Sequence, residues 1–317
     1  MLLLLLWLVF YWLLAFASLI LFNFALARFF ERLVPPQGRF IDADGVRLHV
    51  VDSGVKPGQS GPPLLFLHGL LGQLNHFSFA LAALFPERRV VLLDRPGSGF
   101  SQAAPSQLLA AQADLAAKVI ALLNLGKPLV VGHSFGGAVG LALALDHPDS
   151  VGGLALVAPL THPFAPSQMI AGLGVGNRFT RWIGAWTLGP IVALTRIGLT
   201  QRMVFAPDSQ IAGFWTRAGG FLALRPSPMI AAARELRVVQ KELTGMAARY
   251  AALALPVGVL FGDGDVVLDP KAQGPAFCAK APKAELTRVQ GGHMLPMTQP
   301  KTTESFIRTI LARLDAA

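Results

Sequence analysis

The chain has 317 residues, a formal net charge of +9 and only 14% charged residues. Because a typical globular chain contains about 25% charged residues, this composition predicts that much of the surface is apolar or faces a membrane. The single cysteine, Cys278, excludes an internal disulfide and gives no sign of an oxidising compartment. No nucleic-acid-binding motif accompanies the positive charge, so nucleic acid is not expected as a partner.

The first predicted element is an apolar run from Leu2 to Ala27 that contains no charged residue. As a helix rising about 1.5 Å per residue, this run would span roughly 39 Å, more than the ~30 Å hydrocarbon core of a bilayer. We interpret residues 1–28 as a transmembrane anchor and residues 29–38 as a juxtamembrane linker.

A cleaved signal peptide is the alternative interpretation, because residues 25–27 (A-L-A) have the form of a cleavage site. No Lys or Arg precedes the run, however, and it exceeds the apolar region of about 7–15 residues found in signal peptides, which favours a retained anchor. The flanking arginines, Arg28, Arg32 and Arg39, all follow the run. The positive-inside rule therefore predicts that the remaining domain lies on the cytoplasmic side.

Eight short apolar segments beyond the anchor are typical of strands, and helix-like segments separate most of them. The first two, joined at Asp44-Gly45, are expected to form an antiparallel hairpin. The others alternate with helices, which predicts an α/β fold with a mostly parallel eight-stranded sheet. The expected strands are Arg39–Ala43, Val46–Asp52, Leu64–Leu67, Val90–Leu93, Leu129–Val131, Leu154–Val157, Val257–Phe261 and Ala284–Val289. The expected helices are Phe77–Phe85, Ser106–Leu123, Phe135–Leu145, Lys271–Ala279 and Thr302–Leu314.

Two loops follow strands in the first half of this sheet. Residues 68–72 (H-G-L-L-G) come directly after Leu64–Leu67, and the backbone N–H of Leu70 is our candidate donor to a reacting oxyanion. Residues 94–101 (D-R-P-G-S-G-F-S) come directly after Val90–Leu93.

The most informative motif is residues 132–137 (G-H-S-F-G-G), between an apolar strand and a helix-like run. Such a strand–turn–helix places Ser134 at the tip in a strained backbone conformation. Gly132 and Gly136 are needed where a side chain would strike a neighbouring element. The start of the helix also provides free N–H groups near the serine. Ser134 could instead be an ordinary helix N-cap, but the flanking glycines and the preceding strand favour a nucleophile.

A long interval, from Leu160 to Tyr250, has helical stretches but no strand pattern. It contains ten Lys and Arg residues against three acids, so +7 of the chain's +9 falls here. Aromatic residues among arginines suit an anionic lipid interface. A solvated segment whose aromatics pack inward is the alternative. The aromatics are Trp182, Trp186, Trp215, Phe164, Phe179, Phe205, Phe214 and Phe221.

The last two motifs follow the late strands. Residues 262–265 (G-D-G-D) place carboxylates at the C-terminal end of a strand, where open parallel sheets bind ligands. Asp263 and Asp265 compete as the functional carboxylate, because both follow the strand and either could be a turn residue. Asp269, which precedes a proline, is expected to cap the next helix. His293 follows the last strand, which completes the order Ser, Asp, His.

In these motifs and their order the chain resembles the α/β-hydrolase family, from Arg39 to the C-terminus. The resemblance implies that Ser134 is the nucleophile, that His293 is the general base and then acid, and that Asp265 orients the imidazole. The implied oxyanion donors are the N–H groups of Leu70 and Phe135, and the implied supporting residues are His68, Gly69, Gly132 and Gly136. Similar proteins insert a helical cap where residues 160–250 lie, which leaves residues 39–159 and 251–317 as the core. No cofactor and no metal are expected.

A serine nucleophile forms an acyl-enzyme, which predicts hydrolysis of a carboxylic ester. Epoxide hydrolases and haloalkane dehalogenases of this fold attack with an aspartate, so those activities are not expected. The anchor, the basic aromatic cap and the low polarity point to apolar or lipid-like acyl substrates. Two alternatives stay open: a tethered small-molecule hydrolase (a carbon–carbon bond hydrolase, lactonase or perhydrolase) and a non-catalytic ligand-binding member.

Overall fold

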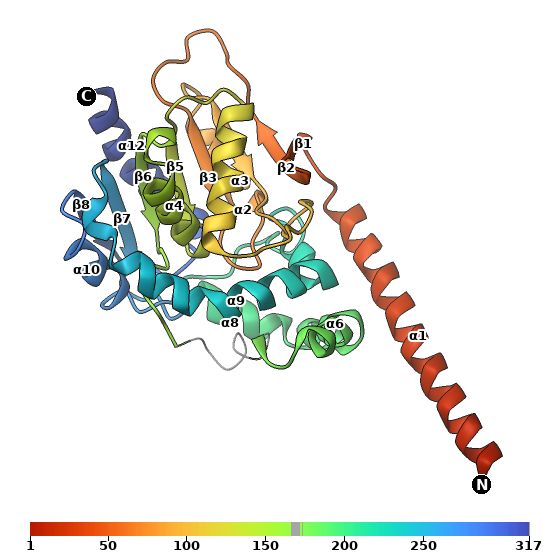
Figure 1. The fold of residues 1–317 in the computed structure, drawn as a ribbon. Helices are drawn as coiled ribbons and strands as arrows, with labels where there is room; N and C mark the ends of the chain where they lie inside the picture. The colour runs from red at the N-terminus through yellow and green to blue at the C-terminus, as the bar shows by residue number, and fades with distance from the viewer. Residues whose placement is uncertain (166–171, 173, 317) are drawn as a thin grey trace.

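A computed structural model describes residues 1–165, 172 and 174–316. An eight-stranded sheet lies at its centre, in the order β1-β2-β4-β3-β5-β6-β7-β8 (Figure 1). β1 pairs with β2, and β2 with β4, in antiparallel fashion, whereas all other neighbours are parallel. The predicted hairpin and mostly parallel sheet are therefore confirmed. The strands are β1 Arg39–Ala43, β2 Val46–Asp52, β3 Leu64–Leu67, β4 Val90–Leu93, β5 Leu129–His133, β6 Gly153–Val157, β7 Val257–Gly262 and β8 Ala284–Val289.

Helices cover both faces of the sheet. Alternate residues of the central strands point to opposite faces, and both sets are buried, which explains why these strands are uniformly apolar. One face packs against α3 and α4, and the other against α12 and the segment around α2. The core helices are α2 Asn75–Ser78, α3 Leu109–Leu122, α4 Phe135–Asp146, α10 Gln273–Cys278, α11 Leu295–Thr298 and α12 Pro300–Asp315.

One predicted core helix is wrong. The structure replaces a continuous helix over Phe77–Phe85 with the short α2 and a 3-10 turn at Ala82–Leu84. Phe77, Leu81 and Phe85 are nevertheless all buried in the same core cluster, so the apolar spacing reflected packing on the sheet rather than an unbroken helix.

The N-terminal helix α1 runs from Leu2 to Leu33. It has a mean hydropathy of 2.5 over 18 residues and is long and apolar enough to cross a membrane, a test that a signal sequence also meets. The helix continues past residue 28, so residues 29–33, predicted as linker, are helical. Figure 1 shows α1 extending away from the domain, toward the side on which the helices between β6 and β7 lie.

Those helices form the segment inserted between β6 and β7, which we call the cap (residues 160–250). In its described part the regular structure is entirely helical. Among the cap aromatics, Phe205 and Phe214 are buried, Phe179 and Trp182 on α6 are exposed, and the other four are half-buried. The cap elements are α6 Arg178–Trp186, α7 Leu188–Thr195, α8 Ile197–Phe205, a 3-10 helix η3 at Gly220–Leu224 and α9 Pro226–Ala247, and a 3-10 turn at Tyr250–Ala252 leads back to the core.

Candidate active site

Ser134 lies on the sharp turn between β5 and α4. Its backbone has φ 53° and ψ −120°, a region that residues other than glycine rarely adopt. A Cβ on Gly132 would lie 2.7 Å from the carbonyl oxygen of Gly136, and a Cβ on Gly136 would lie 2.0 Å from that of Leu67. The flanking glycines are therefore required by close backbone approach, and the turn presents Ser134 at the C-terminal edge of the sheet.

The structure brings Asp265 and His293 together. The Nδ1 atom of His293 lies 2.7 Å from Oδ2 of Asp265, and both residues are buried. Oδ1 of Asp265 accepts hydrogen bonds from the backbone N–H groups of Val267 (2.8 Å) and Leu268 (3.0 Å). Because the carboxylate can only accept, His293 carries a proton on Nδ1, and in the neutral imidazole the lone pair is then on Nε2.

The competing carboxylates lie elsewhere. Asp263 is exposed and bonds Arg288 Nε at 2.7 Å. Asp269 accepts from the N–H of Lys271 at 2.9 Å, in a turn before α10, whereas the N-cap of that helix is Ala272. The prediction that Asp269 caps this helix is therefore wrong, because the helix begins two residues later than predicted.

The predicted oxyanion donors lie beside the serine. Leu70, Ser134, Phe135 and His293 line one cavity. Phe135 is the first residue of α4, so its N–H has no acceptor within the helix. A Cβ on Gly69 would lie 3.0 Å from Cβ of Ser134, so the loop that carries Leu70 approaches the serine closely.

His68 supports this loop in its neutral form. Its Nε2 atom accepts a hydrogen bond from the N–H of Arg95 at 2.9 Å, so Nδ1 carries the proton and donates to the carbonyl of Gly69 at 2.9 Å. Burial, with the nearby charge of Arg95, holds the pKa of His68 well below its ordinary value. His133 is also buried and neutral, because burial lowers its pKa, and its Nε2 donates to the carbonyl of His293 at 3.0 Å.

Arg95 is the residue that sequence reasoning missed. Its guanidinium is 1% exposed, and it donates to the carbonyls of His68 (2.8 Å) and Gly69 (3.0 Å). It also forms an ion pair with Glu235 of α9, which is equally buried. The motif at residues 94–101 marked this loop, but no local signal identified a partner 140 residues away.

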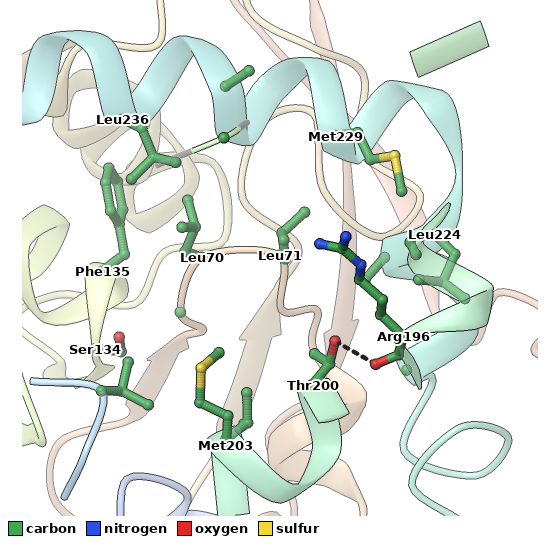
Figure 2. A pocket seen from close by; sticks show the side chains of 18 of the residues that line it. Leu70, Leu71, Ser134, Phe135, Arg196, Thr200, Met203, Leu224, Met229 and Leu236 are labelled. Carbon is green, nitrogen blue, oxygen red and sulfur yellow. Dashed lines mark hydrogen bonds between the residues drawn. The ribbon is translucent and has the colours of Figure 1, made fainter. Parts of the chain in front are cut away.

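The site opens into a cavity of about 630 Å³ between the core and the cap. Figure 2 shows Ser134, Leu70 and Phe135 on the core side and Leu236 and Met229 reaching toward them from α9. Most lining residues are apolar, and the fully charged ones in the described lining are Arg181 and Arg196. The described residues include no group of three His, Cys, Asp or Glu side chains placed to hold a metal ion.

Comparison with known proteins identifies the family. A family model described as the alpha/beta hydrolase fold matches residues 62–300. The chain belongs to the α/β-hydrolase family. The predicted resemblance and fold class are thus confirmed, and the chain is a hydrolase-family member whose cap replaces the connection between β6 and β7.

Two curated relatives differ in how much of this α/β-hydrolase they match. The magnesium-chelatase 30 kDa subunit of Rhodobacter capsulatus is 30% identical over 251 residues, which are 78% of this chain and 84% of the relative. A dihydrolipoyllysine-residue acetyltransferase component of an acetoin cleaving system from Pseudomonas putida is 36% identical over 150 residues. These are 46% of this chain and 36% of the relative, so the chain spans about a third of the first curated relatives it matches.

Among solved structures, that of a membrane phospholipase A, described as a bacterial virulence factor, superimposes with a TM-score of 0.69 at 20% identity. The match covers 100% of both chains. At this identity the likeness establishes a shared fold, and it extends to the N-terminal helix.

Proposed function

We propose that this α/β-hydrolase is a membrane-anchored serine hydrolase that cleaves carboxylic esters of apolar or lipid-like acyl groups through an acyl-enzyme. The observation that carries the proposal is the strained Ser134, which lies with His293 on the wall of an apolar cavity of about 630 Å³. Cavities of 300–1,000 Å³ with few polar groups are typical of small-molecule sites.

The geometry supports a standard acyl-transfer sequence. His293 takes the hydroxyl proton of Ser134 on Nε2 while the serine oxygen bonds to the carbonyl carbon of the ester. The N–H groups of Leu70 and Phe135 receive the oxyanion, and Asp265 stabilises the imidazolium through Nδ1–H. His293 then protonates the departing alcohol. Water, deprotonated by the same Nε2, attacks the acyl-enzyme, and collapse of the second tetrahedral intermediate returns the proton to Ser134 and releases the acid.

The contacts of α1 support a retained anchor rather than a cleaved signal peptide. The side-chain amide of Asn23 is buried and donates to the carbonyls of Trp186 (3.1 Å) and Thr187 (2.6 Å) at the end of α6. Further along α1, Phe30 stacks on Phe221, with ring centroids 4.9 Å apart. Cleavage after residue 27 would remove Asn23 and its hydrogen bonds, and it would leave Phe30 close to a free N-terminus.

The cap surface supports contact with lipid. Exposed apolar side chains lie on three consecutive cap helices, of which α6 contacts α1. An anchor that ends beside these helices would bring them to the bilayer, where a lipid-like ester could enter the cavity laterally. These side chains are Phe179, Trp182, Leu188, Val192 and Leu199. The arginines that follow the apolar run support a cytoplasmic location for the domain.

Arg196 supports an acidic group in the substrate. Figure 2 shows its side chain among apolar pocket residues such as Leu71 and Leu224. Because Arg196 is exposed to solvent and also lines the cavity, its guanidinium would favour a phosphate on the head group of a lipid ester. Arg196→Ala should therefore raise KM for an anionic lysophospholipid about 10-fold and leave a neutral monoacylglycerol unaffected. Arg202→Ala, on α8 but outside the cavity lining, is the matched control.

A ligand-binding role without turnover is the second candidate. It is favoured by one observation: a curated relative that matches most of both chains is named as a magnesium-chelatase subunit. Such a protein would use the apolar cavity to hold a ligand and would have no need of the bond between Asp265 and His293.

A fluorophosphonate probe separates the two candidates. We expect the full-length protein, in membranes and in detergent, to be labelled, and Ser134→Ala to lose labelling completely. Labelled protein should then be assayed with p-nitrophenyl esters from acetyl to palmitoyl, with the rate rising toward longer chains. Preference for acetyl esters would replace the lipid-like substrate with a small one, and a folded wild type without labelling would favour the ligand-binding role.

A further inference from the structure

A buried network joins the cap to the loop that carries Leu70. We propose that Arg95 is a positioning residue that sets the direction of the Leu70 N–H. Through its ion pair with Arg95, Glu235 makes that direction depend on the position of the cap against the core. The inference rests on the proposed acyl-transfer function. It assigns a role in that reaction to two residues that lie outside the nucleophile, the base and the orienting carboxylate.

One peptide bond joins the carbonyl of Gly69 to the N–H of Leu70. This bond is planar and trans, so the Gly69 carbonyl and the Leu70 N–H point in opposite directions. Whatever holds the carbonyl oxygen therefore also aims the N–H. Three donors hold that oxygen: the Gly72 N–H at 3.1 Å, His68 Nδ1 at 2.9 Å and Arg95 Nη2 at 3.0 Å.

Of these three donors, Arg95 is the one that also bonds a second carbonyl of the loop. Its Nε donates to the His68 carbonyl at 2.8 Å, so one rigid guanidinium fixes two successive carbonyls of the loop. Its backbone N–H donates to His68 Nε2, which fixes the tautomer that donates to Gly69. The guanidinium also lies over the ring of Phe135, 4.7 Å from its centroid. Arg95 thus contacts the segments that carry both oxyanion donors.

The remaining guanidinium nitrogen faces the cap. Arg95 Nη1 bonds Gln112 Oε1 at 2.7 Å and forms the ion pair with Glu235, whose carboxylate also accepts from Gln112 Nε2 at 3.0 Å. Arg95 and Glu235 are each 1% exposed, so neither charge is compensated by water. Displacement of α9 would remove the counter-charge of Arg95 and loosen its hold on the Gly69 carbonyl. A cap that is not seated would therefore leave the Leu70 N–H poorly aimed.

The test compares the full-length proteins Glu235→Gln and Arg95→Lys with Arg249→Gln. Arg249 is the matched control, because it bonds a carbonyl (Leu145, 3.0 Å) and a carboxylate (Asp146, 2.7 Å) but lies at the surface. Removal of one oxyanion donor lowers kcat about 10²- to 10³-fold, so a misaimed donor should lower it about 10- to 100-fold. KM should stay within about threefold, because the ground-state ester carbonyl binds the donor weakly. Arg249→Gln should match the wild type.

A second readout separates positioning from general damage. A trifluoromethyl ketone forms a tetrahedral adduct with a negative oxygen, so its Ki should rise by the same factor as kcat/KM falls. A fatty acid product, which lacks that oxygen, should keep its Ki. If Arg95→Lys does not fold, Glu235→Gln decides, because glutamine keeps the shape of glutamate.

Folded variants with kcat within twofold of the wild type, or with a ketone Ki that does not follow kcat/KM, would overturn the inference. A raised KM together with a lowered kcat, and a raised Ki for both inhibitors, would show that the network is only structural and would also overturn the inference. Ser134-dependent labelling of the wild type is the reference in every case. If that labelling is absent, it is the proposed function that fails, whereas labelled wild type with unaffected variants refutes the positioning role alone.

Discussion

Replacement of Asp265 by asparagine is the sharpest test of the proposed site. The change removes one charge and adds two N–H donors without altering the shape of the side chain. Oδ1 of Asp265 accepts from two backbone N–H groups, of Val267 and Leu268. Only the amide oxygen of asparagine can accept these bonds, so the amide NH2 must occupy the position of Oδ2, which lies 2.7 Å from Nδ1 of His293.

The expected consequence is a change of tautomer. An NH2 group facing Nδ1 can only donate, so His293 would carry its proton on Nε2 instead. That nitrogen is the one that must accept the proton of Ser134, and the base would be lost at neutral pH. In serine proteases the same substitution lowers kcat about 10⁴-fold through the same change, and we expect a loss of this order here.

The assay is steady-state hydrolysis of a p-nitrophenyl ester in detergent, together with the rate of fluorophosphonate labelling. Asp263→Asn is the control, because Asp263 also follows β7 but pairs with Arg288 at the surface. We expect the control to retain most of its activity and Asp265→Asn to lose both activities while it keeps its melting temperature. An Asp265→Asn variant within 10-fold of the wild type would refute the assignment, and a large loss in Asp263→Asn would transfer the role to the other carboxylate.

Three further predictions concern stability and orientation. Gly136→Ala should prevent folding or lower the melting temperature sharply, because its Cβ would lie 2.0 Å from the Leu67 carbonyl oxygen. Gly140→Ala should be tolerated, because the nearest atom to its Cβ would be 3.4 Å away. Equal melting temperatures of the two variants would contradict this packing argument. Burial lowers the pKa of His76 to about 4, so the unfolded chain binds the extra proton first, and stability should fall as pH drops from about 6.5 to 4 by up to ~3 kcal/mol. Chemical denaturation of His76→Gln should show a smaller loss over this range, and an unchanged pH slope would argue against the shift. A cysteine placed at the exposed Lys56 in a cysteine-free background should react with an impermeant maleimide only after right-side-out vesicles are opened; reaction in intact vesicles would place the domain outside.

The sequence predicted those parts of the site that depend on local backbone geometry. The position of Ser134 follows from the glycines around it, because the clashes they avoid lie within one strand–turn–helix unit and its neighbouring strand. The five strands β3 to β7 were found for a similar reason, since a strand buried on both faces must be apolar throughout, whereas β1, β2 and β8 are partly exposed and β1 and β2 were found as a hairpin around Asp44-Gly45. Only ends shifted: β5 continues to His133, β6 begins at Gly153 and β7 continues to Gly262.

Long-range contacts were beyond the reach of local patterns. Residues 262–265 by themselves leave two carboxylates open, and the preference for Asp265 came from the family resemblance, because the contact with His293 depends on how the loop after β7 folds back on itself. The pairing of Arg95 with Glu235 was equally hidden, since an arginine in a glycine-rich loop and a glutamate on a helix are both ordinary surface residues in sequence. The end of α1 at Leu33 was missed because cap contacts, not composition, hold its last turns.

The structure shows where the charged side chains of the cap lie, whereas the composition gives only their net charge. All three cap acids are used inward: Glu235 pairs with Arg95, Glu242 accepts from the N–H of Leu109 at 2.8 Å, and Asp208 accepts from the N–H of Gly292 at 3.0 Å. Of the ten basic cap residues, those that form ion pairs with described carboxylates are Arg225, with Glu31, and Arg249, with Asp146. The outer surface of the cap is therefore more basic than its net charge of +7 indicates. Because each basic residue near an anionic bilayer contributes about 1 kcal/mol, we expect this arrangement to add to the lipid contact that we propose for the cap.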